Sequence, residues 1–218
     1  MGARPLASAA NGGASVNIFG FQPYSLVSNL GAEYNRHMEL IGEDDWAVLT
    51  DHDAIPGLDR NWFRYFAEAI AFRPEAGAFV AVTNRIDAFW QRAEEADRDN
   101  HDIEYHTAIA LKRATRRTLL DITDTKGFGG VSFALSKAAW RDAGGFADGL
   151  LCVDHSIHFG LQRAGRRVYL LENVYVYHRR RAVVGKLPDS TPRVANCPCR
   201  GPEPTPTERI ALPELVTA

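Results

Sequence analysis

The stretch Trp46-Ala47-Val48-Leu49-Thr50-Asp51-His52-Asp53 places a short apolar run directly before two aspartates that are one residue apart. A continuous apolar run with a β-branched residue is typical of a strand buried in a parallel sheet. Ligands of open α/β sheets bind just outside the carboxyl ends of such strands. In extended backbone, Asp51 and Asp53 project to one side and His52 to the other. The two carboxylates therefore indicate either a site held by a divalent cation, an arginine or a shared proton, or an acidic turn that caps the next helix.

The composition restricts the class of protein. A chain of 218 residues suits one domain, or one domain with a tail. The formal net charge of -2 gives no reason to expect nucleic acid or a membrane surface as a partner. The basic runs Lys112–Arg113, Arg116–Arg117 and Arg179–Arg181 indicate either solvated surfaces or phosphate binding. No apolar stretch approaches the ~20 residues of a transmembrane helix, so we expect no membrane-spanning segment.

The three cysteines argue for a reducing environment. Cys152 lies in an apolar context, and Cys197 and Cys199 lie among prolines. Three cysteines make no disulfide framework, and one Cys-x-Cys pair makes no zinc site. The N-terminus is small and polar and lacks the apolar core of a signal peptide. These observations predict a cytoplasmic protein.

Strand-like and helix-like segments alternate along most of the chain. We expect strands at 16–21, 46–50, 77–83, 118–123, 128–135, 168–171 and 174–177, and helices from 30 to 41, after Asp59, and at 87–96, 103–117, 137–143 and 154–164. This alternation predicts an α/β sandwich with a largely parallel sheet. Residues 1–15 resemble a flexible leader, residues 16–183 form the domain, and the proline-rich residues 184–218 form a tail or a partner-binding strap.

Several landmarks occur in a characteristic order. The strand ending in Asp51-His52-Asp53 is followed by a glycine-flanked strand over 129–135, the segment 140–146 that ends in Gly-Gly-Phe, Asp154 at the start of a helix, and a strand ending in Val176-Tyr177-His178. This order and spacing resembles the GT-A glycosyltransferases, in particular the family-2-like group of inverting enzymes with a DXD motif. The resemblance covers roughly residues 16–181. It implies a GT-A, Rossmann-like three-layer sandwich with a mostly parallel central sheet.

The resemblance also implies a metal site and a catalytic base. A Mn²⁺ or Mg²⁺ ion would neutralise the departing diphosphate, with Asp53 as direct ligand and Asp51 acting through water or on the donor. His178 matches the third ligand of many members, and an imidazole suits Mn²⁺ somewhat better than Mg²⁺. Asp154 matches the base that takes the proton of the acceptor hydroxyl. Taken alone, His178 also suits an ordinary strand-end histidine, and Asp154 an ordinary helix cap.

Further contacts are implied for the two substrates. The positions matching the nucleotide and donor contacts are Gly20, Phe21, Tyr24, Asn29, Asn35, Asp51, His52 and Arg179. Those matching acceptor contacts are Gly129, Gly130 and His155, and Asn84 and Arg85 follow a strand where acceptor or donor-sugar contacts often arise.

The predicted function is transfer of a sugar from a UDP- or GDP-linked donor to the hydroxyl of a carbohydrate or other acceptor, with inversion. Alternatives are a sugar nucleotidyltransferase and a non-catalytic nucleotide-sugar-binding module. Phe21 and Asp51 lie only 30 positions apart, so the N-terminal half is abridged relative to the family. Val153 and Ser136 replace the acidic and basic residues common at those positions.

Overall fold

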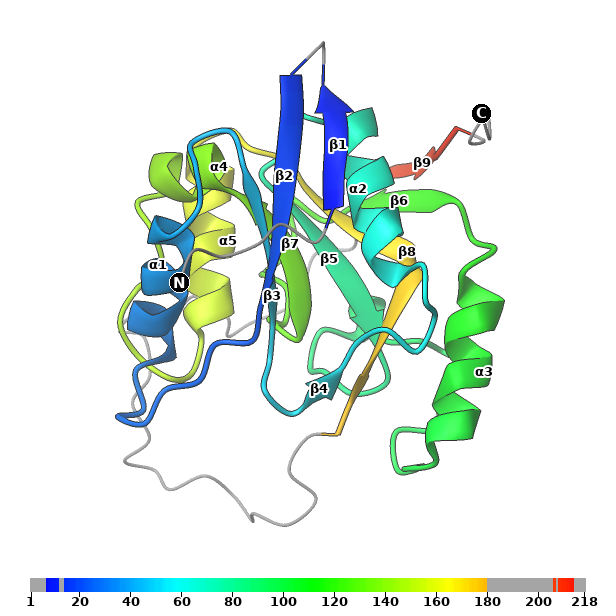
Figure 1. Cartoon of the computed structure of the whole chain (residues 1–218). Coiled ribbons are helices and arrows are strands. Elements are labelled where there is room, and N and C mark those ends of the chain that lie inside the picture. Colours follow the sequence, from blue (N-terminus) through cyan, green and yellow to red (C-terminus); the bar gives the residue numbers. More distant parts are fainter. Residues whose placement is uncertain (1–6, 12–13, 180–205, 207, 214–218) are drawn as a thin grey trace.

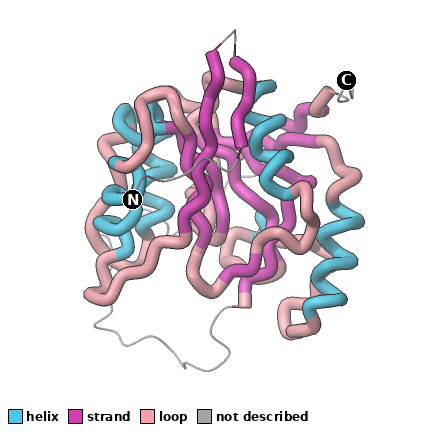
Figure 2. Tube along the Cα trace, in the orientation of Figure 1, coloured by secondary structure: helices cyan, strands magenta, loops and turns pink. Residues whose placement is uncertain are grey.

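The computed structural model describes residues 7–11, 14–179, 206 and 208–213. Strands and helices alternate along these ranges (Figures 1 and 2). In chain order the elements are β1 (Ala7–Asn11), β2 (Ala14–Phe21), α1 (Leu30–Glu39), β3 (Trp46–Thr50), β4 (Ala54–Ile55), α2 (Trp62–Phe72), β5 (Ala78–Thr83), η1 (Phe89–Gln91), α3 (Ile103–Arg113), β6 (Thr118–Asp121), β7 (Ser132–Ser136), α4 (Lys137–Asp142), α5 (Val153–Arg163), β8 (Val168–His178) and β9 (Glu208–Ala211).

The sheet is mixed rather than mostly parallel. Its described strands follow the order β1-β2-β3-β7-β5-β8-β6-β9, and β4 pairs with the end of β8. Within the described ranges, β2 with β3 and β5 with β8 pair in parallel, and the remaining pairs are antiparallel. The expectation of a largely parallel sheet is therefore wrong. β7 runs antiparallel to both β3 and β5, in the same direction as β6, which runs antiparallel to β8.

Helices cover both faces of the sheet (Figure 1). Alternate residues of each central strand point to opposite faces, so Ala47 and Leu49 join one core while Trp46 and Val48 join the other. The first core receives apolar residues of α1, α3, α4 and α5, and the second receives those of α2. All five residues of β3 are buried, as its continuous apolar sequence predicts.

Strand directions bring the predicted site residues to one edge of the sheet. Because β3 and β5 both run antiparallel to β7, and β8 runs parallel to β5, the carboxyl ends of β3, β5 and β8 lie at the same edge. The segment that leads into β7 meets this edge as well, since the Asp51 N–H donates to the Val131 carbonyl at 2.9 Å. Asp51, His178 and the loop before β7 thus converge although they are far apart in sequence.

Two edge strands lie where the sequence predicts a leader and a tail. β1 and the start of β2 fall within residues 1–15, and β1 pairs antiparallel with β2. β9 falls within residues 184–218 and pairs with β6, and the adjoining Leu212 is 6% exposed in the second core. Both segments are short and weakly apolar, so a neighbouring strand is needed to order them. The predicted domain division otherwise stays a prediction.

Two local expectations also differ from the structure. The helix expected at 87–96 is confined to the single 3₁₀ turn η1, because the chain then pairs with the end of β5: Arg92 bridges Thr83, and the Ala93 N–H donates to the Thr83 carbonyl at 2.8 Å. The two late strands at 168–171 and 174–177 form one strand, β8, whose pairing with β5 shifts register between Ala81 and Val82. Such an irregularity accommodates extra residues without ending the strand.

Candidate metal centre

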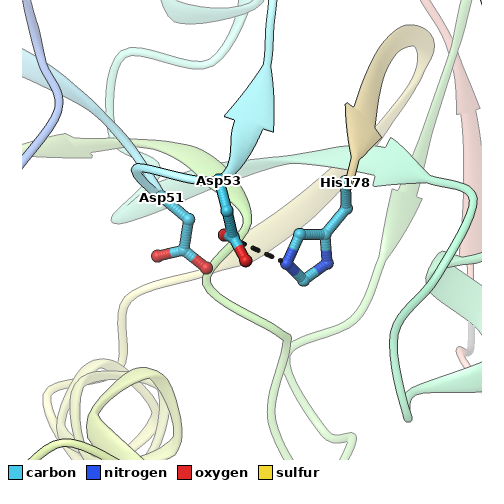
Figure 3. A group of neighbouring side chains, drawn as sticks. All are labelled: Asp51, Asp53 and His178. Atoms are coloured by element: carbon cyan, nitrogen blue, oxygen red, sulfur yellow. Dashed lines mark ion pairs between the residues drawn. The ribbon is translucent and has the colours of Figure 1, made fainter. Parts of the chain in front are cut away.

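Asp51, Asp53 and His178 form one group at the edge of the sheet (Figure 3). Asp51 and Asp53 come from the turn after β3, and His178 ends β8. One ligand atom of each residue lies within 4.8 Å of those of the other two. The backbone joins them too, since Ala54 pairs with His178 and the Arg179 N–H donates to the Asp53 carbonyl at 3.0 Å. The structure therefore brings together the three residues for which the sequence predicts metal binding.

Asp51 is half-buried and contacts Tyr34. Its Oδ1 accepts a hydrogen bond of 2.9 Å from the hydroxyl of Tyr34, which α1 supplies. Burial raises the pKa of Asp51 to about 7, with smaller increases from the charges of Asp53 and Asp154, although His178 and the Tyr34 hydrogen bond lower it. Burial and the neighbouring carboxylate likewise raise the pKa of Tyr34 well above its usual range, so its hydroxyl is a neutral donor.

Asp53 has the opposite electrostatic balance. Its Oδ1 lies 3.3 Å from Nε2 of His178. The hydrogen bond from His178 lowers the pKa of Asp53 to about 2, which outweighs its partial burial. Two carboxylates one residue apart are thus pushed to opposite sides of their ordinary pKa, as occurs where charged groups share a confined site.

His178 is held by the segment that follows β5. Its backbone N–H donates to Oδ1 of Asn84 at 2.8 Å, and its Nδ1 lies 2.8 Å from the carbonyl oxygen of Arg85. Burial lowers the pKa of His178, but the contacts with Asp53 and the Arg85 carbonyl raise it overall. Donation from Nδ1 to a carbonyl leaves Nε2 facing the carboxylates, an arrangement that orients histidines toward metal ions.

The donor set suits a divalent cation. Carboxylate oxygens and one imidazole nitrogen are ligands that Mn²⁺ accepts, whereas a thiolate-rich set would favour zinc. Ligand atoms opposite one another on such an ion are about 4 Å apart, which is close to the observed span. Within the described ranges, the contacts of Asp51 and Asp53 include no arginine or lysine. A cation would therefore add positive charge to that of His178, beside which the described residues place no arginine or lysine on these carboxylates.

Asp154 lies beside this group, in the first turn of α5. Its Oδ2 accepts from the Gly130 N–H at 2.8 Å, and its Oδ1 from the His155 N–H at 2.9 Å. Its charge contributes to the raised pKa values of both Asp51 and Tyr34. Each carboxylate oxygen keeps a second lone pair that could accept a proton or a hydrogen bond.

The glycines before β7 pack tightly within the protein. A Cβ on Gly129 would come within 2.2 Å of Ile86, and one on Gly130 within 3.2 Å of the Asp154 Cβ. The buried Gln91 accepts from the Gly129 N–H at 2.8 Å and donates to its carbonyl at 2.9 Å. Both glycine N–H groups are thus engaged by side chains. Contact of Gly129 or Gly130 with an acceptor stays a prediction.

His155 packs against the same loop. A Cβ on Gly127, whose φ is +118°, would come within 2.4 Å of the His155 ring. The loop therefore needs glycine at this position for both its backbone angle and its close approach to α5. The predicted contact of His155 with an acceptor is not tested by this packing.

The loop after β2 lies next to the acidic turn. Nε2 of Gln22 donates to the Asp51 carbonyl at 3.1 Å, and the Tyr24 ring meets the His52 ring edge-on at 5.2 Å. Tyr24 is 55% exposed, and Gly20 and His52 are exposed as well. Phe21 instead packs edge-on against His37, at 5.1 Å between ring centroids. Among the predicted nucleotide contacts, Tyr24 and His52 thus present accessible rings beside the carboxylates.

Asn29 and Asn35 hold α1 in place. Asn29 caps α1 by accepting from the Ala32 N–H at 3.1 Å, and it also accepts from the Gly149 N–H at 3.0 Å. Asn35 exchanges two hydrogen bonds of 2.8 Å with the Phe146 backbone and accepts from the Trp140 indole at 2.9 Å. The protein itself engages both amides, and their predicted contact with a nucleotide stays a prediction. Arg179 is exposed beside His178, whereas Arg180 and Arg181 lie outside the described residues.

Sequence reasoning did not predict the contacts that support the ligands. Tyr34 is an aromatic residue whose ring is in the core, so no sequence pattern indicated the role of its hydroxyl. The Arg85 carbonyl acts through backbone, which carries no sequence signal. For Asn84, 2% exposed, the sequence indicates a substrate contact because this residue follows an apolar strand, and the structure shows its amide holding the His178 N–H. Gln91, 0% exposed, lies in η1 and carried no such signal.

Comparison with models of known protein families finds no match, and comparison with curated proteins finds none either. No helix in the described part of the chain is both long enough and apolar enough to cross a membrane.

Proposed function

We propose that this chain is a metal-dependent glycosyltransferase of the GT-A, family-2-like kind. It would move a sugar from a UDP- or GDP-linked donor to an acceptor hydroxyl, with inversion. The observation that carries the proposal is the convergence of Asp51, Asp53 and His178 at the carboxyl edge of the sheet, with Asp154 beside them. The four residues follow the order of the family's motifs along the sequence, and they also lie near one another in space, which supports the proposal.

Each residue has a chemical role in this proposal. Asp53 and His178 would hold Mn²⁺ or Mg²⁺ directly, and Asp51 would complete the ligand set or bind through water. The cation would neutralise the diphosphate of the donor as it departs. Asp154 would take the proton of the acceptor hydroxyl, with its carboxylate oriented by the Gly130 N–H. Tyr24 and His52 offer exposed ring surface to a nucleobase next to the metal ligands.

Nucleotide binding with and without metal tests the proposal. Calorimetric titration with UDP, GDP and their sugars should detect binding that requires Mn²⁺. Asp53→Asn should weaken Mn²⁺ binding by at least about 100-fold and remove the metal dependence. Asp44→Asn changes the same charge at an exposed position and serves as the matched control. Metal-independent binding, or no binding of any of these nucleotides, would contradict the proposal. Metal-dependent binding without transfer or hydrolysis of the sugar would instead favour a non-catalytic nucleotide-sugar-binding module.

A further inference from the structure

Tyr34 connects the hydrophobic core to the candidate metal centre. Its side chain is 1% exposed, and its ring packs against Phe133 and Phe146, with centroids 6.0 and 4.9 Å away. The hydroxyl is the one polar group of this side chain, and it donates to the Asp51 Oδ1 at 2.9 Å. The core therefore fixes the position of a single donor that faces a carboxylate.

We propose that Tyr34 is a positioning residue that holds Asp51 in the orientation needed to bind a divalent cation. This inference rests on the proposed function, because it concerns the same cation. Donation to Oδ1 restricts the carboxylate and leaves Oδ2 available to a ligand. Partners that orient metal-binding carboxylates and histidines typically change metal affinity 10- to 100-fold when removed.

The helix that carries Tyr34 is anchored at its start and next to Tyr34 itself. Asn29, which caps the helix, accepts from the Gly149 N–H. Asn35, the residue after Tyr34, hydrogen-bonds to the Phe146 carbonyl and the Trp140 indole. Side-chain packing alone would leave the helix free to slide by small amounts, but these directed bonds fix its height above Asp51. The hydroxyl therefore reaches Asp51 in a defined place rather than by chance contact.

The chain contains a matched control for this interaction. Tyr65 on α2 is 6% exposed, and its hydroxyl donates to Oδ2 of Asp59 at 2.8 Å. Asp59 belongs to no candidate ligand group in the described residues. Tyr34→Phe and Tyr65→Phe thus remove the same kind of buried tyrosine–aspartate hydrogen bond, one at the candidate centre and one away from it.

Mn²⁺ alone is the probe for the decisive experiment. Electron paramagnetic resonance of free Mn²⁺, titrated against the full chain, gives the dissociation constant without nucleotide or turnover. We expect Tyr34→Phe to weaken Mn²⁺ binding about tenfold or more, and Tyr65→Phe to leave it within about twofold. Circular dichroism and thermal unfolding without metal should show both variants folded and destabilised to a similar extent.

A second substitution separates positioning of Asp51 from general loosening. If Tyr34 acts through Asp51, Tyr34→Phe should change Mn²⁺ affinity by less than about twofold when Asp51 is already asparagine. An unchanged Mn²⁺ affinity in Tyr34→Phe, or an equal loss in Tyr65→Phe, would overturn the inference while leaving the proposed function intact. Absence of Mn²⁺ binding by the unaltered protein would overturn both.

Discussion

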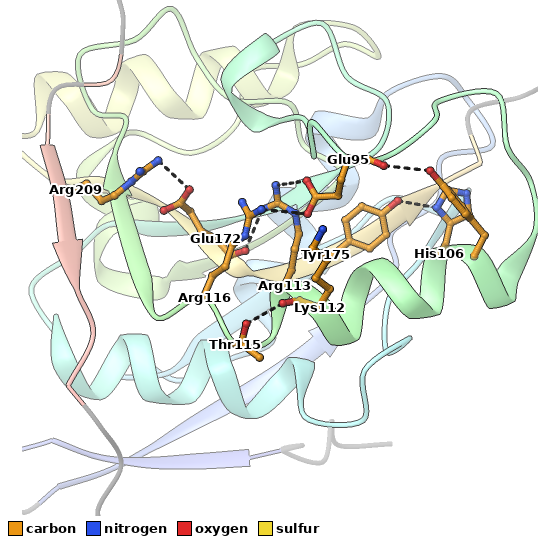
Figure 4. Close-up of polar contacts among 10 residues, drawn as sticks. Glu95, His106, Lys112, Arg113, Thr115, Arg116, Glu172, Tyr175 and Arg209 are labelled. Carbon is orange, nitrogen blue, oxygen red and sulfur yellow. Dashed lines mark hydrogen bonds and ion pairs between the residues drawn. The ribbon is translucent and has the colours of Figure 1, made fainter.

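Two clusters of charged residues use the same chemistry to opposite effect. The ion-pair network, formed by Glu95, Arg113, Arg116, Glu172 and Arg209, links α3 to β8 and β9 (Figure 4). Arg113 and Arg116 lie 3.1 and 3.3 Å from Glu95, and Arg209 lies 3.1 Å from Glu172. The acidic corner, formed by Asp51, Asp53, Asp154 and His178, places two carboxylates beside one imidazole, with the Asp154 charge close enough to raise the pKa of Asp51.

Their pKa values show the difference. Burial raises the pKa of Glu95, but a backbone hydrogen bond and the two arginines lower it overall, so this carboxylate is satisfied as an anion. Burial raises the pKa of Asp51 to about 7, and no arginine offsets it in the described residues. The network pairs its carboxylates with arginines, whereas in the described residues His178 is the one cationic partner within the acidic corner. A carboxylate without a strong cationic partner lowers the stability of the fold, and such a cost is common at functional sites.

The largest effect is expected from Asp154→Asn. Asparagine keeps the size of the side chain but cannot accept a proton at neutral pH, so sugar transfer should fall about 10²- to 10⁴-fold. Mn²⁺ and nucleotide affinities should change little, because Asp154 lies beside the ligand group and outside it. Steady-state kinetics, with the nucleotide sugar that binds in the titration as donor, measure the transfer rate, and titrations with Mn²⁺ and nucleotide measure the affinities. Full turnover by Asp154→Asn would show that another group is the base.

Arg113→Ala should mainly reduce the stability of the fold. Arg113 is 3% exposed, and its loss leaves Glu95 without its closest cation, which typically costs about 3–5 kcal/mol in the free energy of unfolding. Arg116→Ala is the control, since that side chain is 41% exposed and its pair should contribute about 1 kcal/mol or less. Urea unfolding measures both values. Equal losses in the two variants, or a changed Mn²⁺ affinity in Arg113→Ala, would remove the distinction between the clusters.

The sequence predicts the acidic corner better than the sheet that carries it. Asp51, Asp53 and His178 follow apolar runs, and residues after buried strands reach one edge whenever their strands share a direction. β3, β5 and β8 do share a direction, so the convergence was predictable. Strand order was not, because the reversed strand β7 lies between β3 and β5 without any sequence signal for its neighbours.

Supporting contacts were the least predictable part of the site. The Tyr34 hydroxyl and the Arg85 carbonyl act through contacts between elements that only the folded chain brings together. The resemblance matches Asn35, on the helix before the Asp51 strand, to a nucleotide contact, which stays a prediction; the structure shows its amide bonded to the Phe146 backbone. A polar residue on a helix can face a ligand or a neighbouring loop, and periodicity does not separate these outcomes. The edge strands β1 and β9 escaped prediction because their order depends on pairing partners.

The smallest effect is expected from Asp51→Asn, which should stabilise the fold, whereas most substitutions destabilise it. Folding raises the pKa of Asp51 from 3.8 to about 7, so the folded state favours the protonated form. The stability that this provides is fully present below pH 3.8 and is lost as pH rises through 7. Above pH 7 the buried charge opposes folding, and Asp51→Asn should raise the thermal midpoint at pH 8 by about 2–4 °C, or about 1 kcal/mol.

Mn²⁺ should reverse this ranking. The cation stabilises only a chain that binds it, so saturating Mn²⁺ at pH 8 should raise the midpoint of the unaltered protein more than that of Asp51→Asn. The stabilising contribution of His178 is also lost as pH rises, through the raised pKa of this histidine. Both chains contain His178, so the difference between their midpoints mainly reports Asp51. Asp53, whose pKa folding lowers from 3.8 to about 2, stabilises the folded state of both chains at pH 5 and at pH 8 alike. Thermal unfolding of both chains at pH 5 and pH 8, with Mn²⁺ and with chelator, measures the midpoint of each chain under each condition. A lower midpoint for Asp51→Asn at pH 8 without metal would mean that Asp51 stabilises the fold as an anion, and the contrast with Glu95 would then disappear.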